Sequence, residues 1–475
     1  MTRYTILTGG TGLVGRYLVR DLLLEGHPLA LLIRPTSKLS VADRAEEILQ
    51  FWESQLGRPL SRPVLLDGDV CREGLGLAHD DRCWVERHCG SLIHNAASLT
   101  FNGADRAGEP WRTNLDGTRH VLEFCRTAGI RDLHYVSTAY VAGTRSGVIY
   151  ETELDCGQSF RNEYEQSKCL AEKEVRAASF LDQLTVYRPA VIAGDSRTGY
   201  TSTYHGLCMY LQLISVINRN TEPDEHGVRH TDIRLNMTGD EPRNIVPVDW
   251  VSEVIATIFG NPAFHGQTYH LSPEERLTPR QIVEAGYRYY NSTGVEFCGA
   301  ETQIDETVST AERATYESKT MYEAYEHSDP VFDTTNLQRA VPQLPCPVID
   351  QAMLHRFWKY GEEDRWGRRK PAEITVPVWI AEVLAKNSTE ILARFLDQNP
   401  QLDTPHVKLG IDIVGPGGGQ WTLLRDSQQG TRLERGIAAD VCGVLQESSE
   451  RFANFVAKSS PASNSPFKLN LAISN

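Results

Sequence analysis

The sequence predicts a doubly wound α/β fold, in which helices cover both faces of a parallel sheet. Two observations support this prediction. From Tyr4 to about Pro189, short apolar runs alternate with stretches whose apolar residues have helical spacing, and a glycine-rich turn directly follows the first run. Apolar runs that do not alternate with polar residues indicate strands buried on both faces. The repeated order of strand, helix and strand is typical of a Rossmann-type sheet.

The predicted elements follow one another regularly in this part of the chain. Each strand is a short apolar run, and each helix has apolar residues every three or four positions. The expected strands are Tyr4–Thr8, Leu29–Ile33, Val64–Leu66, Ser91–His94, Leu133–Val136 and Leu184–Tyr187. The expected helices are Leu13–Leu24, Val41–Gln55, Trp111–Ala128 and Asn162–Ala178. Residues 1–190 are therefore assigned to the cofactor part of a first domain that covers 1–365.

The regular alternation ends near residue 190, which indicates a smaller substrate-side region over about 190–365. A strand is expected at Asn244–Val248, and a helix from Asp249 to Phe259 with Asp249 as its N-cap. A basic, turn-rich segment then indicates a linker at 366–376.

Residues 377–475 are expected to form a separate α+β domain. A helical stretch covers Pro377–Phe395, and Val407–Val414 alternates with the period of a strand. A glycine turn and Trp421–Leu424 follow, and together these segments predict a half-buried hairpin. A last helix is expected at Ser448–Val456.

The composition disfavours several classes of partner. The formal net charge of the 475 residues is −14, whereas nonspecific nucleic-acid binding requires a basic surface. No apolar stretch approaches the roughly 20 residues of a membrane span, so no integral membrane segment is expected. The ten cysteines contain no CxxC pair, so no metal site is expected. Met1 precedes the first strand too closely for a cleavable signal peptide, and a reducing, cytoplasmic location is expected.

Thr8–Gly15 has the sequence TGGTGLVG and lies between the first expected strand and the first expected helix. In that position Gly9 allows a tight turn, Gly12 lets the backbone approach a pyrophosphate, and Gly15 permits close packing of helix on strand. The start of the helix presents unpaired N–H groups to an anion. The turn therefore predicts a dinucleotide site whose other members are Thr11, Leu13 and Val14.

The residues after the second strand favour NADP(H) over NAD. An NAD site usually has an acidic residue there, which bonds the ribose 2′-hydroxyl. This chain has Arg34 at that place and no acidic residue before Asp43. A guanidinium group binds a 2′-phosphate in fork geometry, whereas a carboxylate repels it. We therefore expect Arg34 to bind the 2′-phosphate.

Tyr164 and Lys168 are four residues apart in an expected helix, so they share one face of it. A free tyrosine, with a pKa near 10, is a poor proton donor or acceptor at neutral pH. An ammonium group one turn away is expected to lower that pKa. Tyr164 would then exchange a proton with a carbonyl oxygen while a hydride moves to or from the nicotinamide.

Hydroxyl groups end the fifth expected strand, in the segment Tyr135–Tyr140. They lie at the carboxyl edge of the sheet, where folds of this type bind their ligands. Either Ser137 or Thr138 is expected to hydrogen-bond the substrate oxygen and hold it for Tyr164.

Residues 1 to about 290 resemble the extended short-chain dehydrogenases/reductases. The resemblance rests on TGxxGxxG at Thr8–Gly15, on YxxxK at Tyr164–Lys168 and on the hydroxyl segment, together with the elements Asn95-Ala96-Ala97 and Asn114 in Asn-Leu-Asp-Gly-Thr. It implies that Thr138 is the catalytic hydroxyl and Ser137 its neighbour. It also implies a catalytic role for Asn114 and cofactor contacts for Asn95, Ala96 and Ala97.

Within that superfamily, the chain is most similar to thioester reductase domains and fatty acyl reductases. The similar segments are Leu32–Pro35, His94–Ala97, Val136–Val141 and Tyr187–Gly199. The likeness implies reduction of an acyl thioester, on coenzyme A or an acyl carrier protein, to an aldehyde and onward to an alcohol, with a long-chain or other lipid substrate. It further implies that Pro189 and Val191 back the nicotinamide and that Asp69 and Val70 flank the adenine.

The last hundred residues resemble a sterol-carrier-protein type of lipid-binding domain. The residues that carry this likeness are Ile411–Leu423, Ala439–Val441 and the helix Ser448–Val456. The resemblance implies an apolar tunnel for acyl chains or sterols, which would concentrate a water-insoluble substrate beside the reductase. The alternative is a packing or dimerisation module with a filled core.

Two other functions remain open for the whole chain. A hydroxysteroid or sugar-nucleotide dehydrogenase/epimerase would use Tyr164 and Lys168 equally well. A non-catalytic NADP- or lipid-binding protein is the other alternative, and the presence of both residues with a hydroxyl at position 138 argues against it.

Overall fold

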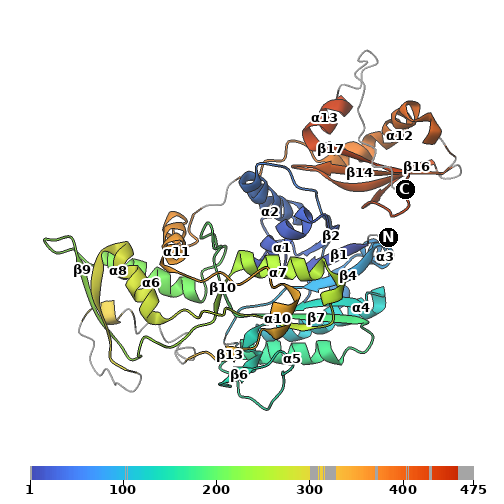
Figure 1. The fold of residues 1–475 in the computed structure, drawn as a ribbon. Helices are drawn as coiled ribbons and strands as arrows, with labels where there is room; N and C mark the ends of the chain where they lie inside the picture. Colours follow the sequence, from blue (N-terminus) through green and yellow to red (C-terminus); the bar gives the residue numbers. More distant parts are fainter. Residues whose placement is uncertain are drawn as a thin grey trace.

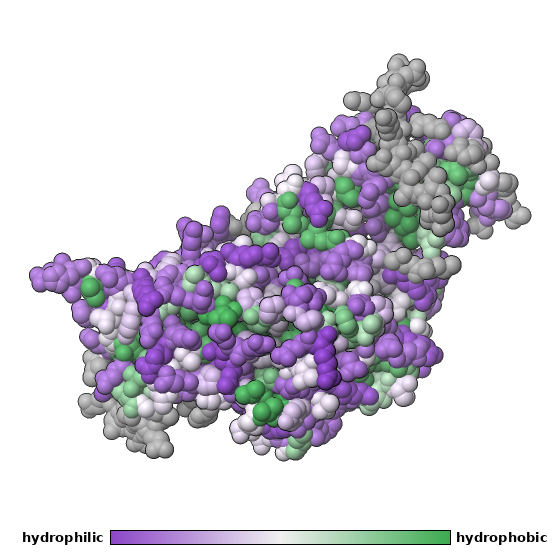
Figure 2. Space-filling model, in the orientation of Figure 1, coloured by the Kyte–Doolittle hydropathy of each residue, from purple (hydrophilic) through white to green (hydrophobic). Residues whose placement is uncertain are grey.

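The computed structural model describes residues 3–101, 103, 105–299, 309, 311–313, 315, 328–369, 373–402, 404, 406–426 and 430–457. Within these residues an α/β domain is followed by a small unit, coloured orange to red in Figure 1, that is built on a second sheet. Hydrophilic residues cover most of the face shown in Figure 2, and the hydrophobic ones form small separate groups. No helix among the described residues is long and apolar enough to cross a membrane.

The α/β domain contains a seven-stranded sheet in the order β11-β7-β5-β4-β1-β2-β3. Its neighbouring strands all pair in parallel, which confirms the predicted doubly wound fold. The strands are β1 Tyr4–Thr8, β2 Leu29–Ile33, β3 Val64–Asp67, β4 Cys89–His94, β5 Asp132–Val136, β7 Gln183–Pro189 and β11 Thr268–Leu271. The strand order reverses between β1 and β4, and folds of this type bind ligands at the carboxyl ends of such strands.

Helices cover both faces of this sheet because their apolar stripes are buried against it (Figure 1). One face packs on α1 Leu13–Leu24, α2 Val41–Leu56 and α7 Val248–Phe259. The other packs on α3 His79–His88, α4 Gly117–Ala128 and α5 Glu163–Ala177. Full burial of one large aliphatic or aromatic side chain stabilises a fold by about 1.5–3 kcal/mol. These two apolar layers therefore hold the strand ends in fixed positions.

Two predicted helix starts differ from the structure. The helix expected from Trp111 opens with a π-helical turn, Arg112–Asp116, before α4 begins. Asp249 does not cap α7, because the helix already begins at Val248 after the extended residue Pro247. The Asp249 carboxylate instead accepts hydrogen bonds from the backbone N–H of Ser196 at 2.8 Å and from its hydroxyl at 2.6 Å.

The substrate-side region contributes short elements that surround the carboxyl end of the sheet. Strand β8 Val191–Ala193 pairs in parallel with β10 Ile245–Pro247, and the predicted strand at Asn244–Val248 is thus present. Strand β9 Arg229–Leu235 pairs in parallel with β12 Ser292–Phe297. The remaining elements are β6 Val148–Ile149, β13 Val331–Phe332, α6 Leu207–Asn220, α8 Pro279–Tyr290, α10 Thr335–Ala340 and α11 Gln351–Glu363, with short 3-10 turns at Glu73–Gly76, Ala139–Ala142 and Pro262–Phe264.

The C-terminal unit is a four-stranded mixed sheet in the order β16-β15-β14-β17, covered by two helices. The predicted hairpin is confirmed, and the first and last helices begin and end within a few residues of the expected positions. The elements are α12 Ile380–Gln398, β14 Val407–Val414, β15 Gly419–Asp426, β16 Gly430–Arg435, β17 Gly443–Ser448 and α13 Ser449–Ala457, with a 3-10 turn at Pro400–Leu402. Residues 370–372 of the predicted linker and 458–475 of the predicted domain lie outside the described residues.

This unit contacts the α/β domain at the amino end of its sheet. The hydroxyl of Tyr4, the first residue of β1, donates to the side-chain oxygen of Gln420 at 2.7 Å. The Trp84 indole donates to the carbonyl of Arg435 at 2.7 Å. The unit therefore lies at the edge opposite the carboxyl ends of the strands, where the ligand site is expected.

Candidate active site

The glycine turn after β1 has the shape that its sequence predicts. Gly9 has a φ of +70°, and a Cβ atom there would lie 2.6 Å from the backbone nitrogen of Ala96. A Cβ atom on Gly15 would lie 2.0 Å from the carbonyl oxygen of Gly9. Both positions therefore exclude side chains. Helix α1 follows, with Gly12 as its N-cap. No side chain caps the start of this helix, and the first turn of the helix contains no acidic residue. Its unpaired N–H groups fit the pyrophosphate of a dinucleotide.

A cavity of about 900 Å³ opens beside this turn. It brings together almost all the predicted cofactor residues, from segments that are far apart in the chain. Those that line it are Gly9, Thr11, Gly12, Leu13, Val14, Arg34, Asp69, Val70, Asn95, Ala96, Ala97, Tyr164, Lys168, Pro189 and Val191. Gly15 packs behind the glycine turn instead. The residues therefore fit an extended dinucleotide with its nicotinamide end near Tyr164.

Tyr164 lies in the first turn of α5, whose N-cap is Asn162. Burial raises the pKa of the Tyr164 phenol to about 12, and a hydrogen bond with the Thr138 side chain opposes this shift. The phenol is therefore protonated at neutral pH and is ready to donate. The expectation that Lys168 lowers the pKa of Tyr164 is not what this structure shows, because desolvation dominates there.

Lys168 is fully enclosed below Tyr164. Its ammonium group donates to the carbonyl oxygen of Val136 at 2.8 Å and lies 4.5 Å from the centre of the Tyr135 ring. Burial lowers the pKa of Lys168 to about 7, while Glu172 acts in the opposite direction. A buried amine with a neutral pKa gains and loses its proton in the physiological range.

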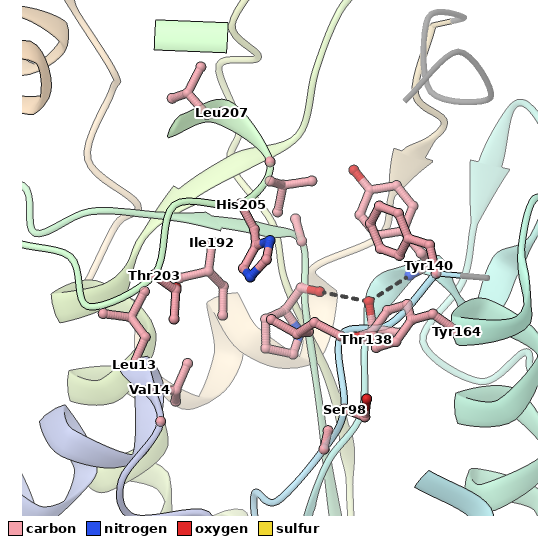
Figure 3. A pocket seen from close by; sticks show the side chains of 18 of the residues that line it. Leu13, Val14, Ser98, Thr138, Tyr140, Tyr164, Ile192, Thr203, His205 and Leu207 are labelled. Atoms are coloured by element: carbon pink, nitrogen blue, oxygen red, sulfur yellow. Dashed lines mark hydrogen bonds between the residues drawn. The ribbon is translucent and has the colours of Figure 1, made fainter. Parts of the chain in front are cut away.

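Ser137 and Thr138, between which the sequence did not decide, have different hydrogen-bond partners in the structure. The Thr138 hydroxyl accepts from the backbone N–H of Tyr140 at 3.2 Å and lies 3.5 Å from the carbonyl oxygen of Pro189. Figure 3 shows it beside the Tyr164 ring. The Ser137 hydroxyl instead donates to the carboxylate of Glu172 at 2.6 Å. Thr138 is thus placed to hold a substrate oxygen, whereas the hydroxyl of Ser137 is occupied in a buried network.

That network contains an acidic residue that the sequence reasoning missed. Glu172 is fully buried, one turn after Lys168 on α5, and it pairs with Arg188 of β7 at 2.7 Å. Its spacing of eight residues from Tyr164 is the signal that could have placed it on the same helix face.

Asn114 is buried in the π-helical turn, and its side chain bonds two segments of the site. Its amide nitrogen donates to the carbonyl of Ser98 at 3.1 Å and to the hydroxyl of Ser167 at 3.0 Å. Its side-chain oxygen accepts from the backbone N–H of Ser98 at 2.8 Å. Asn114 therefore connects the loop after β4 to α5, beside Lys168. Single π-helical turns often occur at functional sites.

Two arginines lie where the adenosine ribose is expected. Arg34 follows β2, has a side chain that is 61% exposed, and approaches the Asp69 carboxylate at 3.5 Å. Arg44 of α2, which sequence reasoning missed, also lines the cavity and donates to the Thr11 hydroxyl at 3.1 Å. Burial and the charge of Arg34 both lower the pKa of Arg44. Arg44 could have been predicted as a second phosphate-binding arginine, because it lies in the first turns of the helix that follows Arg34 and β2.

Beyond Tyr164 the cavity continues into an apolar chamber, which we define by its lining residues in the substrate-side region. On α6 these side chains recur every three or four residues and so share one face of the helix. The chamber residues are Leu207, Tyr210, Leu213, Ile214, Ile217, Ile233, Leu235, Met237, Ile282, Val283 and Val295. Sequence reasoning identified none of them, because an apolar face on a helix is equally typical of a protein core.

Known proteins share the sequence and fold of the region that contains this site. Residues 7–255 match the family described as male sterility protein. Among solved structures, the terminal R domain from the myxalamid PKS-NRPS biosynthetic pathway superimposes with a TM-score of 0.61 and 23% identity, over 78% of this chain and 92% of that chain. At this level of identity the likeness concerns the fold.

Two curated proteins with related sequences differ in length from this chain. The non-canonical nonribosomal peptide synthetase FrzA of a Cladobotryum species is 24% identical over 405 residues, which are 75% of this chain and 36% of that protein. A putative fatty acyl-CoA reductase of Drosophila melanogaster is 37% identical over 149 residues, which are 29% of this chain and 28% of that protein. The chain thus spans about a third of the length of these relatives.

Proposed function

Because the chain belongs to the male sterility protein family, we propose that it is an NAD(P)-dependent oxidoreductase that reduces an acyl thioester to an aldehyde. One observation carries the proposal. A single cavity contains the glycine turn, the paired hydroxyls of Thr138 and Tyr164, and the apolar chamber. These are the places that a dinucleotide, a reacting carbonyl and an acyl chain require.

The residues of the site support a simple sequence of proton transfers. When bound, a reduced nicotinamide supplies a hydride to the carbonyl carbon of the thioester. Thr138 and Tyr164 hold the carbonyl oxygen, and Tyr164 donates its proton as negative charge develops there. The ammonium of Lys168 stabilises the phenolate that Tyr164 becomes. The carbon–sulfur bond of the resulting hemithioacetal then breaks, and the products are one aldehyde, one thiol and the oxidised cofactor.

NADPH is the reductant that the ribose end of the cavity favours. Arg34 and Arg44 both line this end of the cavity, where Arg44 donates to the Thr11 hydroxyl and Arg34 approaches Asp69. Burial and the nearby charge of Arg34 lower the pKa of Arg44, and a 2′-phosphate would relieve this repulsion between the two arginines. Arginine binds phosphate more strongly than it binds a hydroxyl because the hydrogen bonds are charge-assisted. Asp69 lies near Arg34 and would contact the adenosine in this arrangement.

The apolar chamber favours a long acyl chain over a sugar nucleotide. Aliphatic side chains dominate its walls, and the polar side chains in the same region are Thr203, His205, Arg243, Thr315 and Asp329. A sugar would need several hydrogen-bonding partners along the chamber. Each buried methylene adds about 0.8 kcal/mol to binding. One relative is a peptide synthetase and another acts on fatty acyl-CoA, so the thiol of the substrate belongs to a carrier protein or to coenzyme A.

The test is NADPH oxidation by the purified chain, followed by absorbance with a long-chain acyl-CoA, with the matching aldehyde and with a UDP-sugar. Oxidation with the thioester, and formation of the aldehyde detected by mass spectrometry, would support the proposal. Activity with the aldehyde alone would contradict the assignment of a thioester substrate, but it would still support an NADPH-dependent reductase. Epimerisation returns the hydride and consumes no NADPH, so that alternative is tested by chromatography of the UDP-sugar, and conversion to its epimer would favour it.

The lipid-binding role of residues 377–475 stays a prediction. Within the described residues, α12 and α13 cover the sheet with an apolar core that includes Leu384, Leu392, Ile411 and Phe452. An apolar core of this kind equally suits a packing module. Retention of a fluorescent fatty acid by the full chain, compared with a chain in which Leu392→Trp fills the core further, would distinguish the two roles.

A further inference from the structure

Three side chains of types that bind metal ions lie close together at the amino end of β5, at the sheet edge opposite Thr138. They are Asp132, His134 and His265. Asp132 is the first residue of β5 and His134 is two residues further along, so both side chains lie on the same face of the strand. His265 follows the 3-10 turn Pro262–Phe264, which comes after α7. One ligand atom from each of the three residues lies within 4.8 Å of the other two.

The protonation of His265 follows from its hydrogen bond. Its Nε2 atom lies 3.0 Å from the carbonyl oxygen of Phe259. A carbonyl accepts and never donates, so the proton of a neutral imidazole is on Nε2. The other ring nitrogen, Nδ1, then has a lone pair, and it lies 3.9 Å from the nearer carboxylate oxygen of Asp132, Oδ2.

His134 adds a second nitrogen to the same space. It is fully buried, and its Nδ1 atom lies 2.9 Å from the hydroxyl of Tyr187. Its Nε2 atom lies 3.4 Å from Oδ1 of Asp132. Neither of those two buried atoms has a hydrogen-bond partner among the described residues, although buried polar atoms almost always have one. With the His134 proton on Nδ1, directed at the Tyr187 hydroxyl, two nitrogen lone pairs and a carboxylate converge on a space in which a cation would satisfy all three. With that proton on Nε2, His134 would instead donate to Oδ1 of Asp132.

We propose that Asp132, His134 and His265 bind a zinc ion, with water as the fourth ligand. Two imidazoles and a carboxylate are a ligand set that zinc uses, at about 2.0–2.2 Å from the metal. Tetrahedral ligands at that distance are separated from one another by about 3.3 Å. One carboxylate oxygen of Asp132 lies 3.4 Å from the His134 nitrogen and the other lies 3.9 Å from the His265 nitrogen, which is close to this separation.

The surroundings of the three residues support a built site. Metal-bound histidines usually donate their second N–H to a carbonyl or another fixed acceptor, which sets the ring orientation. Phe259 provides such a carbonyl for His265, and the oxygen of the Tyr187 hydroxyl, 2.9 Å from Nδ1, would accept from His134 when Nε2 binds the metal. The Asp132 side chain is 30% exposed, so water and ions reach the site from solvent.

The zinc ion would connect the turn after α7 to β5, and it would do so at the edge of the sheet away from Tyr164 and Lys168. Its expected effect is therefore on stability, and it does not depend on the proposed reductase activity. The competing state is a direct hydrogen bond from Nε2–H of His134 to Asp132, which needs no metal. The two states predict different zinc contents.

The test uses the full chain, depleted of metal with a chelator, reloaded with zinc and dialysed. The variants His265→Gln and Asp132→Asn remove one ligand each. Two matched controls alter histidines beside other ligating groups: His230→Gln, whose ring lies 3.0 Å from the exposed Asp224, and His79→Gln, whose ring lies 3.6 Å from the Cys83 sulfur. Zinc content is measured by mass spectrometry, and affinity by competition with a chromophoric chelator.

We expect one tightly held zinc ion per chain, and a loss of affinity of at least about 100-fold in His265→Gln and Asp132→Asn. The two controls should retain wild-type affinity. Zinc should raise the unfolding temperature of the wild-type chain and of both controls only, and X-ray absorption should show two imidazole nitrogens on the metal. No retained zinc, or zinc lost through His79→Gln instead, would overturn the proposal.

Discussion

The two ends of the cavity were built in different ways. At the catalytic end, Thr138 and Tyr164 stand at the carboxyl edge of a parallel sheet whose strands are fixed by two buried apolar layers. At the chamber end, the walls are α6, α8, β9 and β12, which lie outside the main sheet. The chemistry therefore depends on the shared scaffold, and the choice of substrate depends on the inserted elements. Substitutions at the two ends should separate these properties.

The largest effect is expected at the catalytic end. Tyr164→Phe should lower kcat by about 10²–10⁴-fold because the general acid is lost, while NADPH binding, followed by its fluorescence, stays within about twofold. Tyr210→Phe, which alters a tyrosine of the chamber, is the matched control and should retain most of the activity. Full activity in Tyr164→Phe would show that the assigned proton donor is wrong.

The next largest effect on kcat is expected at Thr138, and it should distinguish this residue from the adjacent Ser137. Thr138→Val should lower kcat about 10²–10³-fold, because a donor to the developing oxyanion disappears, with little change in unfolding temperature. Ser137→Ala should keep kcat and lower the free energy of unfolding by about 1–3 kcal/mol, because Glu172 loses a buried partner. Steady-state kinetics and thermal unfolding of both variants measure this. The reverse pattern would assign catalysis to Ser137.

At the ribose end, the double variant Arg34→Ala with Arg44→Ala should reduce the ratio of kcat/KM for NADPH to that for NADH by about 10–100-fold. Charge-assisted hydrogen bonds to the 2′-phosphate account for this magnitude. Lys38→Ala removes an exposed positive charge from the same loop and serves as the control. An unchanged ratio in the double variant would mean that the site does not recognise the 2′-phosphate.

A smaller effect is expected in the chamber. Ile217 lies ten residues after Leu207 on α6, which places it about 15 Å further along the helix axis. Ile217→Trp should lower kcat/KM about tenfold for long-chain thioesters, because the larger ring occupies the space of the chain end. Short-chain thioesters should react at the wild-type rate. An equal loss for both chain lengths would indicate that the acyl chain lies elsewhere.

The smallest effect concerns pH. Lys168 has a pKa lowered to about 7 by burial, so raising the pH through 7 removes its positive charge. The neutral amine no longer stabilises the Tyr164 phenolate, and kcat/KM for reduction should fall to half of its low-pH plateau at pH about 7. Tyr164, with a pKa of about 12, stays protonated in this range. A profile that rises between pH 6 and pH 8 would contradict this assignment.

The parts of the molecule that the sequence determined by itself are local or periodic. Most strands and helices of residues 4–189 follow from apolar spacing, because a buried strand and an amphipathic helix have different periods. Helix α3 and strand β6 were not predicted. The glycine turn follows from positions at which a Cβ atom does not fit. Tyr164 and Lys168 lie on one helix face because they are four residues apart.

The tertiary structure decided what depends on residues distant in sequence. It favours Thr138 over Ser137, because the Ser137 hydroxyl is bound to Glu172 of α5, and it placed Arg44 beside Thr11 across two elements. It set the pKa values of Tyr164 and Lys168, because desolvation depends on everything packed around a group. It also assembled the chamber, and it joined Asp132 and His134 to His265, which is 131 positions further along the chain. No local pattern encodes these contacts, because long-range packing brings their members together.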